Sequence, residues 1–65
     1  MNGYYYFAFT NGDPVRTSFK ENEINIEEMR EQFVGTWVKT GDEDHDTGRV
    51  NDIWTTEQAN AYYNN

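Results

Sequence analysis

Cysteine is absent from this chain of 65 residues, so neither a disulfide framework nor a thiolate metal site can form. A secreted domain of this size usually carries such crosslinks, and their absence favours an intracellular location. No run of residues approaches the ~20 consecutive apolar positions of a membrane span. The first residues also lack the basic and apolar regions of a signal peptide. The sequence therefore predicts a soluble, cytoplasmic protein that does not bind membranes.

Cationic side chains are also scarce. Five Lys and Arg residues stand against twelve Asp and Glu residues, which gives a formal net charge of −7. Such a surface repels nucleic acid and anionic lipid, and it attracts basic protein surfaces or divalent cations. Nucleic-acid binding depends on clustered Lys and Arg side chains, whereas the five cations here are scattered along the chain. Direct binding to nucleic acid is therefore not expected.

Motifs of catalysis are lacking as well. Ser18 is the only serine, and no nucleophile motif surrounds it. The five glycines are dispersed, so no glycine-rich phosphate loop is present. Carboxylates are abundant, but a carboxylate that acts as a general acid needs burial in a cleft to raise its pKa. We therefore predict that the protein is not an enzyme and uses no cofactor.

Aromatic residues, in contrast, are plentiful. They make up 17% of the chain, although all hydrophobic residues together make up only 35%. Each buried ring removes roughly 150–250 Å² of surface from water, so a few rings can replace many aliphatic side chains in a core. The composition therefore predicts one small folded domain, residues 1–65, near the lower size limit for independent folding.

The first part of the chain predicts a β-hairpin. Residues 4–10 are rich in aromatic side chains, as strands are, and both faces of this segment are largely apolar, as in a central strand. Asn11 and Gly12 follow, and this pair tolerates the positive φ angles of a tight turn. Val15–Lys20 then alternates between apolar and polar residues, which is typical of a second strand.

Residues 26–34 are predicted to form a helix. Asn25 precedes this segment and can cap it by accepting a hydrogen bond from the backbone amide of Glu28. Gly35 suits the position just beyond the end of a helix. Apolar residues recur with helical spacing at Ile26, Met29 and Phe33.

The second part of the chain predicts two more strands and a short helix. The strands are residues 36–40 and 48–54, joined by a polar loop at 41–47. Thr55 or Thr56 can cap the terminal helix. The element order is therefore ββαββα, and we predict an α+β domain with a single antiparallel sheet of about four strands. Its first helix has about nine residues.

The polar loop contains carboxylates at alternate positions, as calcium-binding loops do. These are Asp42, Asp44 and Asp46. An EF-hand also needs Gly at the sixth position and Glu at the twelfth, but this chain has Thr47 and Ile53 there. The loop is therefore only a weak candidate for a divalent cation, and a solvated turn is the simpler interpretation.

Two acidic segments and an excess of aromatic side chains indicate a protein partner, because rigid rings are common at interface hot spots. The predicted contact residues are Glu27, Glu28, Glu31, Asp42, Glu43, Asp44, Asp46, Tyr4, Tyr6, Trp37 and Trp54. For the aromatic residues there is an equal alternative, a sheet that is covered by a helix on each face. For the acidic residues the alternative is that the charge serves only solubility.

The leading functional hypothesis is a non-enzymatic acidic module that binds the basic surface of a larger protein. In its sharpest form the carboxylates imitate a phosphate backbone, and the module inhibits a nucleic-acid-handling protein of a host cell. Its size and charge are similar to those of small inhibitor proteins from phages and mobile elements, a likeness of composition alone. It would then act in the host cytoplasm. The alternatives are a weak calcium-binding domain that uses residues 42–46 and a structural subunit that self-associates as a homo-oligomer.

Overall fold

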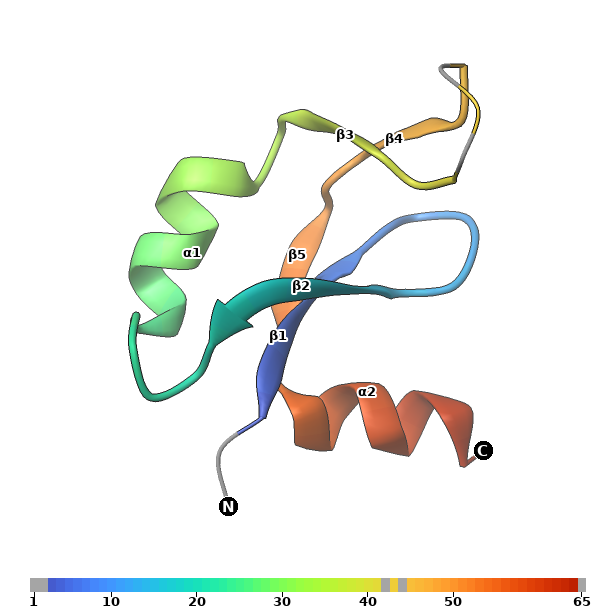
Figure 1. The fold of residues 1–65 in the computed structure, drawn as a ribbon. Helices are drawn as coiled ribbons and strands as arrows, with labels where there is room; N and C mark the ends of the chain where they lie inside the picture. Colours follow the sequence, from blue (N-terminus) through green and yellow to red (C-terminus); the bar gives the residue numbers. More distant parts are fainter. Residues whose placement is uncertain (1–2, 42, 44, 65) are drawn as a thin grey trace.

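The computed structural model describes residues 3–41, 43 and 45–64. The elements of the described residues, labelled in Figure 1, are β1 (Tyr4–Ala8), β2 (Val15–Lys20), α1 (Ile26–Phe33), β3 (Trp37–Lys39), β4 (Thr47–Arg49), β5 (Asp52–Trp54) and α2 (Thr56–Tyr63). The predicted α+β class and the two helices are confirmed. The strand number differs, because the segment predicted as one strand at 48–54 contains two strands, β4 and β5.

The strands that the structure describes form two antiparallel sheets, so the prediction of a single sheet was wrong. One sheet has the order β2-β1-β5, and the other is the two-stranded ribbon β3-β4. The Val50 amide donates to the Thr36 carbonyl at 2.9 Å, and the Gly35 amide donates to the Val50 carbonyl at 2.8 Å. The next amide, that of Asn51, donates to Ala8 of β1 at 2.8 Å. The chain therefore changes sheets here, with the buried Val50 side chain anchoring the change.

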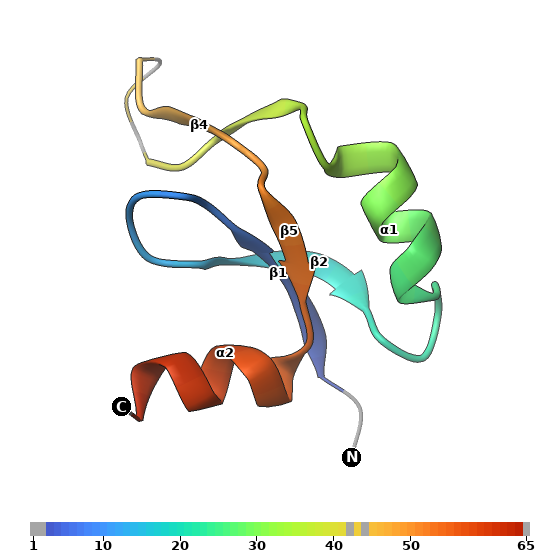
Figure 2. The same ribbon diagram turned by 180° about the vertical axis from the view of Figure 1, so that it is seen from behind.

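β1 lies in the middle of the three-stranded sheet, as its two apolar faces predicted. On one face, Tyr5 and Ile53 of β5 belong to a core that includes Met29 of α1. On the other face, the ring of Trp54 lies 5.6 Å from that of Tyr62 of α2. Because successive residues of a strand point to opposite faces, α1 and α2 cover opposite faces of the sheet. Figures 1 and 2 show the two helices on different sides of β1 and β5.

The main core lies between α1 and the sheet. Its buried side chains are Tyr5, Met29, Val50 and Ile53, and half-buried residues pack around them: Phe7, Phe9, Ile24, Ile26, Phe33 and Val38. The Phe33 ring lies 5.1 Å from that of Phe7 and 5.3 Å from that of Phe19. Aromatic rings therefore supply much of the apolar contact, as the composition predicted.

Both helices begin at residues that the sequence identified as caps. The Asn25 side chain accepts from the Glu28 amide at 2.8 Å. Thr55 and Gln58 exchange two hydrogen bonds, which form a capping box at the start of α2. α1 ends one residue earlier than predicted, and Gly35 follows with a φ of +90°. Glycine adopts this left-handed conformation without steric cost.

The Tyr5 side chain connects the sheet to the segment that enters α1. Its ring is buried, and its hydroxyl donates to the Ile24 carbonyl at 2.7 Å. Burial, and to a lesser degree the nearby charge of Glu21, raises the pKa of this hydroxyl above its ordinary value. The neutral hydroxyl is therefore the form that the fold requires.

Replacing Tyr5 by phenylalanine (Tyr5→Phe) is expected to lower the free energy of unfolding by about 1 kcal/mol, because the ring stays buried while the hydrogen bond is lost. Since the pKa of Tyr5 is raised by folding, its contribution is complete below the ordinary pKa of 10.0 and is lost as the pH rises through the folded-state pKa. The wild type should therefore lose stability in alkaline solution more steeply than Tyr5→Phe.

Chemical denaturation from neutral pH to about pH 11 measures both effects. Tyr4→Phe is the matched control, because the Tyr4 hydroxyl makes no hydrogen bond within the described part of the chain. Equal alkaline slopes for the wild type and Tyr5→Phe would contradict the role given to this hydroxyl.

Candidate functional site

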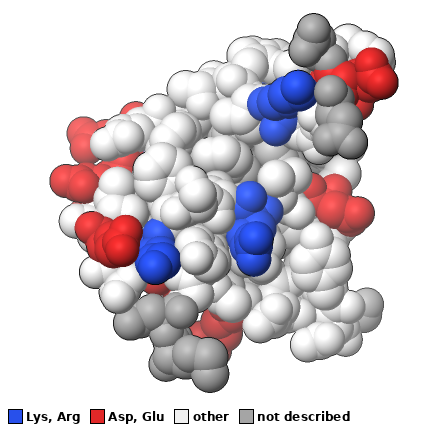
Figure 3. Space-filling model, viewed as in Figure 1, with Lys and Arg blue, Asp and Glu red and all other residues white. Residues whose placement is uncertain are grey.

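The outer face of α1 carries three exposed carboxylates, those of Glu27, Glu28 and Glu31. Residues three or four positions apart are neighbours on a helix surface, so Glu31 lies next to both of the others. None of the three side chains forms an ion pair or a hydrogen bond with another described residue. Figure 3 shows acidic side chains gathered on the side of the molecule where α1 lies.

None of the described cationic side chains forms an ion pair with these carboxylates, and three of the cations are held in other contacts. Arg30 of α1 turns toward the sheet, where its Nε lies 3.1 Å from an Asp52 carboxylate oxygen. The Arg16 guanidinium lies over the Tyr4 ring, 5.1 Å from its centroid. Arg49 donates through Nε to a backbone carbonyl at 3.4 Å. The outer face of α1 therefore shows an uncompensated negative charge to the solvent.

Three of the predicted aromatic contact residues lie on the opposite face of the sheet, next to α2. Tyr6 and Trp54 are cross-strand partners, and the Trp54 ring packs against Tyr62. The Tyr4 ring lies beneath the Arg16 guanidinium. All three side chains are half-buried, so they belong to the packing between the sheet and α2.

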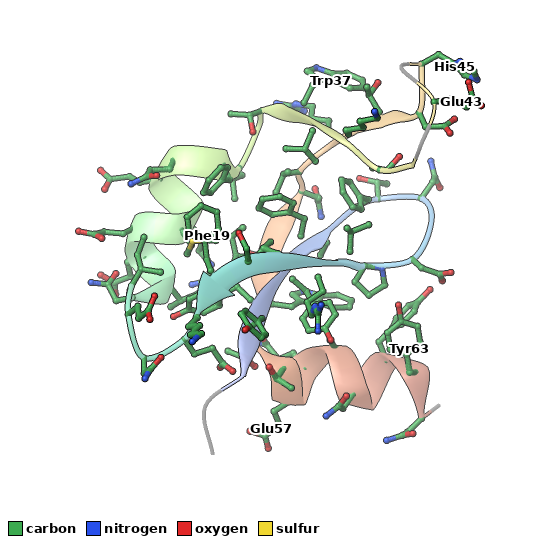
Figure 4. The ribbon with its side chains drawn as sticks, in the orientation of Figure 1. Phe19, Trp37, Glu43, His45, Glu57 and Tyr63 are labelled. Atoms are coloured by element: carbon green, nitrogen blue, oxygen red, sulfur yellow. The ribbon has the colours of Figure 1, made fainter. Side chains whose placement is uncertain are left out.

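Trp37 differs from those residues, because 69% of its surface is exposed to solvent. This is the largest exposed fraction among the exposed large hydrophobic residues of the described chain. It lies opposite Arg49 in the β3-β4 ribbon, and Lys39 lies opposite Thr47. These four exposed residues share the outer face of the ribbon. Figure 4 shows the Trp37 ring pointing away from the body of the molecule.

Arg49 was missed by the sequence-based prediction, although Arg and Trp are both enriched at interface hot spots. Its position beside Trp37 depends on the register of the ribbon. The only sequence signal for this pairing was the prediction of two strands at 36–40 and 48–54 joined by a loop. The outer face of the ribbon therefore combines an exposed ring with cations, whereas the outer face of α1 is acidic.

The described residues of the predicted acidic loop lie at the end of the β3-β4 ribbon. Asp42 and Asp44 fall outside the described residues. Glu43 is exposed and Asp46 is half-buried, with His45 Nε2 lying 3.6 Å from Asp46 Oδ1. Figure 4 shows Glu43 and His45 well away from α1. Within the described ranges, no group of three or more His, Cys, Asp or Glu side chains is arranged to hold a metal ion.

The predicted contact residues are thus distributed over three regions. Three of the predicted glutamates lie on the outer face of α1. The ribbon and its loop hold Trp37, Glu43 and Asp46, and the α2 side of the sheet holds the three half-buried rings. None of the helices that the structure describes has the length and apolarity to cross a membrane.

Comparison of this chain with models of protein families, with curated proteins and with solved structures finds no match. Function is therefore inferred from the charge, the exposure and the contacts of the described residues.

Replacing Glu31 by lysine (Glu31→Lys) is expected to stabilise the fold by about 0.5–1 kcal/mol, because the change removes repulsion with Glu27 and creates an attractive pair at the favourable spacing. The new cation also lies near the negative C-terminal end of the helix dipole. Glu31→Gln removes only the repulsion, so it should give a smaller gain.

Chemical denaturation at low and high salt measures these differences. The gains should shrink as salt rises, because exposed charges are screened. A loss of stability in Glu31→Lys would contradict this account of charge repulsion on the outer face of α1. A gain in stability that does not depend on salt would contradict it as well.

Proposed function

We propose that this chain is a non-enzymatic module that docks on a basic surface of a larger protein through the outer face of α1. The observation that carries the proposal is the set of exposed carboxylates of Glu27, Glu28 and Glu31, which no cation of the described chain compensates. Complementary charge accelerates association and suppresses wrong partners. A partner's Lys and Arg side chains would supply the neutralisation that the module itself lacks.

Glu31 adds support, because local helix energetics disfavour a carboxylate at this position. It repels Glu27 one turn away, and it lies in the half of α1 nearest the negative end of the dipole. A residue that weakens its own helix is most easily understood where the surface is used for binding. Stability lost in this way is regained when the carboxylate meets a cation of the partner.

The partner class that fits this surface best is a protein that handles nucleic acid. Such a protein carries Lys and Arg side chains that bind phosphates, and carboxylates displayed by a short rigid helix present a comparable row of negative charges. The module would then act as an inhibitor that imitates nucleic acid, of the kind that phages and mobile elements encode, in the cytoplasm of the host cell. This class of partner is the sharpest form of the proposal.

The test begins with the tagged protein as bait in a native lysate at low salt, followed by binding kinetics with the purified partner. The double variant Glu27→Gln with Glu31→Gln should lower the association rate constant about fivefold or more and flatten its dependence on salt, because steering by charge acts mainly on association. DNA or RNA should compete with the wild type for the same partner.

The matched control is Glu43→Gln with Glu57→Gln, which removes the same charge from two exposed positions away from α1. Figure 4 shows Glu43 and Glu57 at opposite ends of the molecule, neither on α1. If both double variants lose association rate equally, the net charge of the chain, and not the outer face of α1, determines the rate. Recovery of the bait alone, or an unchanged rate in the α1 variant, would refute docking through this face.

A second candidate function is self-association, which the outer face of the ribbon favours. Trp37 and Arg49 lie side by side there. The Arg49 cation complements the acidic outer face of α1 on another copy, and the Trp37 ring adds apolar contact area. Sedimentation equilibrium over a range of concentrations distinguishes the two candidates. A monomer at high concentration and low salt would remove this second one.

A further inference from the structure

A hollow of about 340 Å³ opens between the loop that joins β1 to β2 and the β3-β4 ribbon. Figures 1 and 2 both show this loop and the ribbon side by side. The side of the loop contributes Phe9 and Asp13, and the ribbon contributes Thr47, Gly48 and the neighbouring Thr40. Volumes of roughly 300–1,000 Å³ are typical of sites for small ligands, so this hollow has room for one side chain of a partner.

The walls of the hollow are held in place by tertiary contacts. Gly48 leaves room for the Phe9 ring, since a Cβ at this glycine would lie only 3.0 Å from a Phe9 ring carbon. Two residues of α2 hold the loop: the Tyr62 hydroxyl donates to the Asp13 carboxylate at 2.9 Å, and the Tyr63 hydroxyl donates to the backbone carbonyl of the next loop residue at 3.2 Å. A site that is already ordered loses little entropy on binding.

The charge of the hollow selects the class of occupant. Asp13 is the only charged residue among the described residues that line it, and its carboxylate has acceptor sites left after the bond from Tyr62. An anion would be repelled by Asp13 and by the net charge of −7. A metal ion would need several oxygen ligands, and a purely apolar group would desolvate Asp13 without pairing it.

We infer that this hollow receives an arginine side chain of the docking partner, so the inference rests on the proposed function. The guanidinium group stacks on the Phe9 ring, as arginine does on aromatic faces. Its planar donors pair with the Asp13 carboxylate, and the Thr40 hydroxyl accepts one of its remaining N–H groups. Lysine carries a compact charge without a planar surface, so it fits the same hollow less well.

The experiment is an NMR titration of the full chain, labelled with ¹⁵N, with N-acetyl-arginine amide. Saturable shifts are expected at the amides of Phe9, Thr47 and Gly48, with a dissociation constant on the order of millimolar. The lysine analogue should bind more weakly, and the neutral analogues N-acetyl-glutamine amide and N-acetyl-leucine amide should cause no saturable shifts there.

Two variants test the geometry. Asp13→Asn keeps an acceptor for the Tyr62 hydroxyl but removes the charge, so it should weaken arginine binding about fivefold or more. Tyr62→Phe removes the hydrogen bond that orients the Asp13 carboxylate but keeps its charge, so it should weaken arginine binding less than Asp13→Asn does. Glu57→Gln, the matched control, removes one exposed charge from the outer part of α2 and should leave the dissociation constant unchanged.

Shifts that are equal for the arginine and leucine analogues, or binding that Asp13→Asn does not weaken, would overturn the inference. An absence of saturable shifts with the arginine analogue would overturn it as well. The proposed function has a separate readout, because Glu27→Gln with Glu31→Gln changes association with the partner but not the affinity of the hollow for N-acetyl-arginine amide. A failure of one is therefore distinguishable from a failure of the other.

Discussion

β1 is the strand on which the rest of this small structure depends, because it is hydrogen-bonded to a neighbour along each edge and is apolar on each face. Tyr5 must be covered from one side and Ala8 from the other, and both are buried. A chain of 65 residues meets this demand with two helices of eight residues each, one for each face. The inner side of each helix is therefore committed to packing, and function is left to the outer surfaces.

Those outer surfaces differ in chemistry because the cations are unevenly shared. Arg30 and Arg16 stabilise contacts within the molecule, which leaves the outer face of α1 acidic. Arg49 lies instead beside Trp37 on the outer face of the ribbon. The hollow near Asp13 is a third surface, which combines this carboxylate with the aromatic ring of Phe9. The charged side chains behind the net charge of −7 are thus distributed unevenly over distinct surfaces. Solubility alone does not require such an uneven distribution.

The predicted features that were confirmed depend on residues close together in the chain. Asn25 lies three positions from the amide that it caps, and Thr55 lies three positions from its capping partner Gln58. The division of 48–54 into two strands was missed, because it depends on hydrogen bonds from Val50 and Asn51 to segments that are distant in sequence. The acidic character of α1 could equally be predicted from the sequence. The lack of a compensating cation among the described residues could not.

The order of residues therefore established the helices, their starting points, the central position of β1 and the acidic outer face of α1. Folding in three dimensions established the two separate sheets, the pairing of Trp37 with Arg49 and the contact of Tyr62 with Asp13, which are 49 residues apart. The physical reason is that these two groups of features depend on interactions of different range along the chain. Caps, turns and side-chain periodicity act within one or two turns of chain, but strand partners and long-range side-chain contacts depend on which apolar faces are buried together.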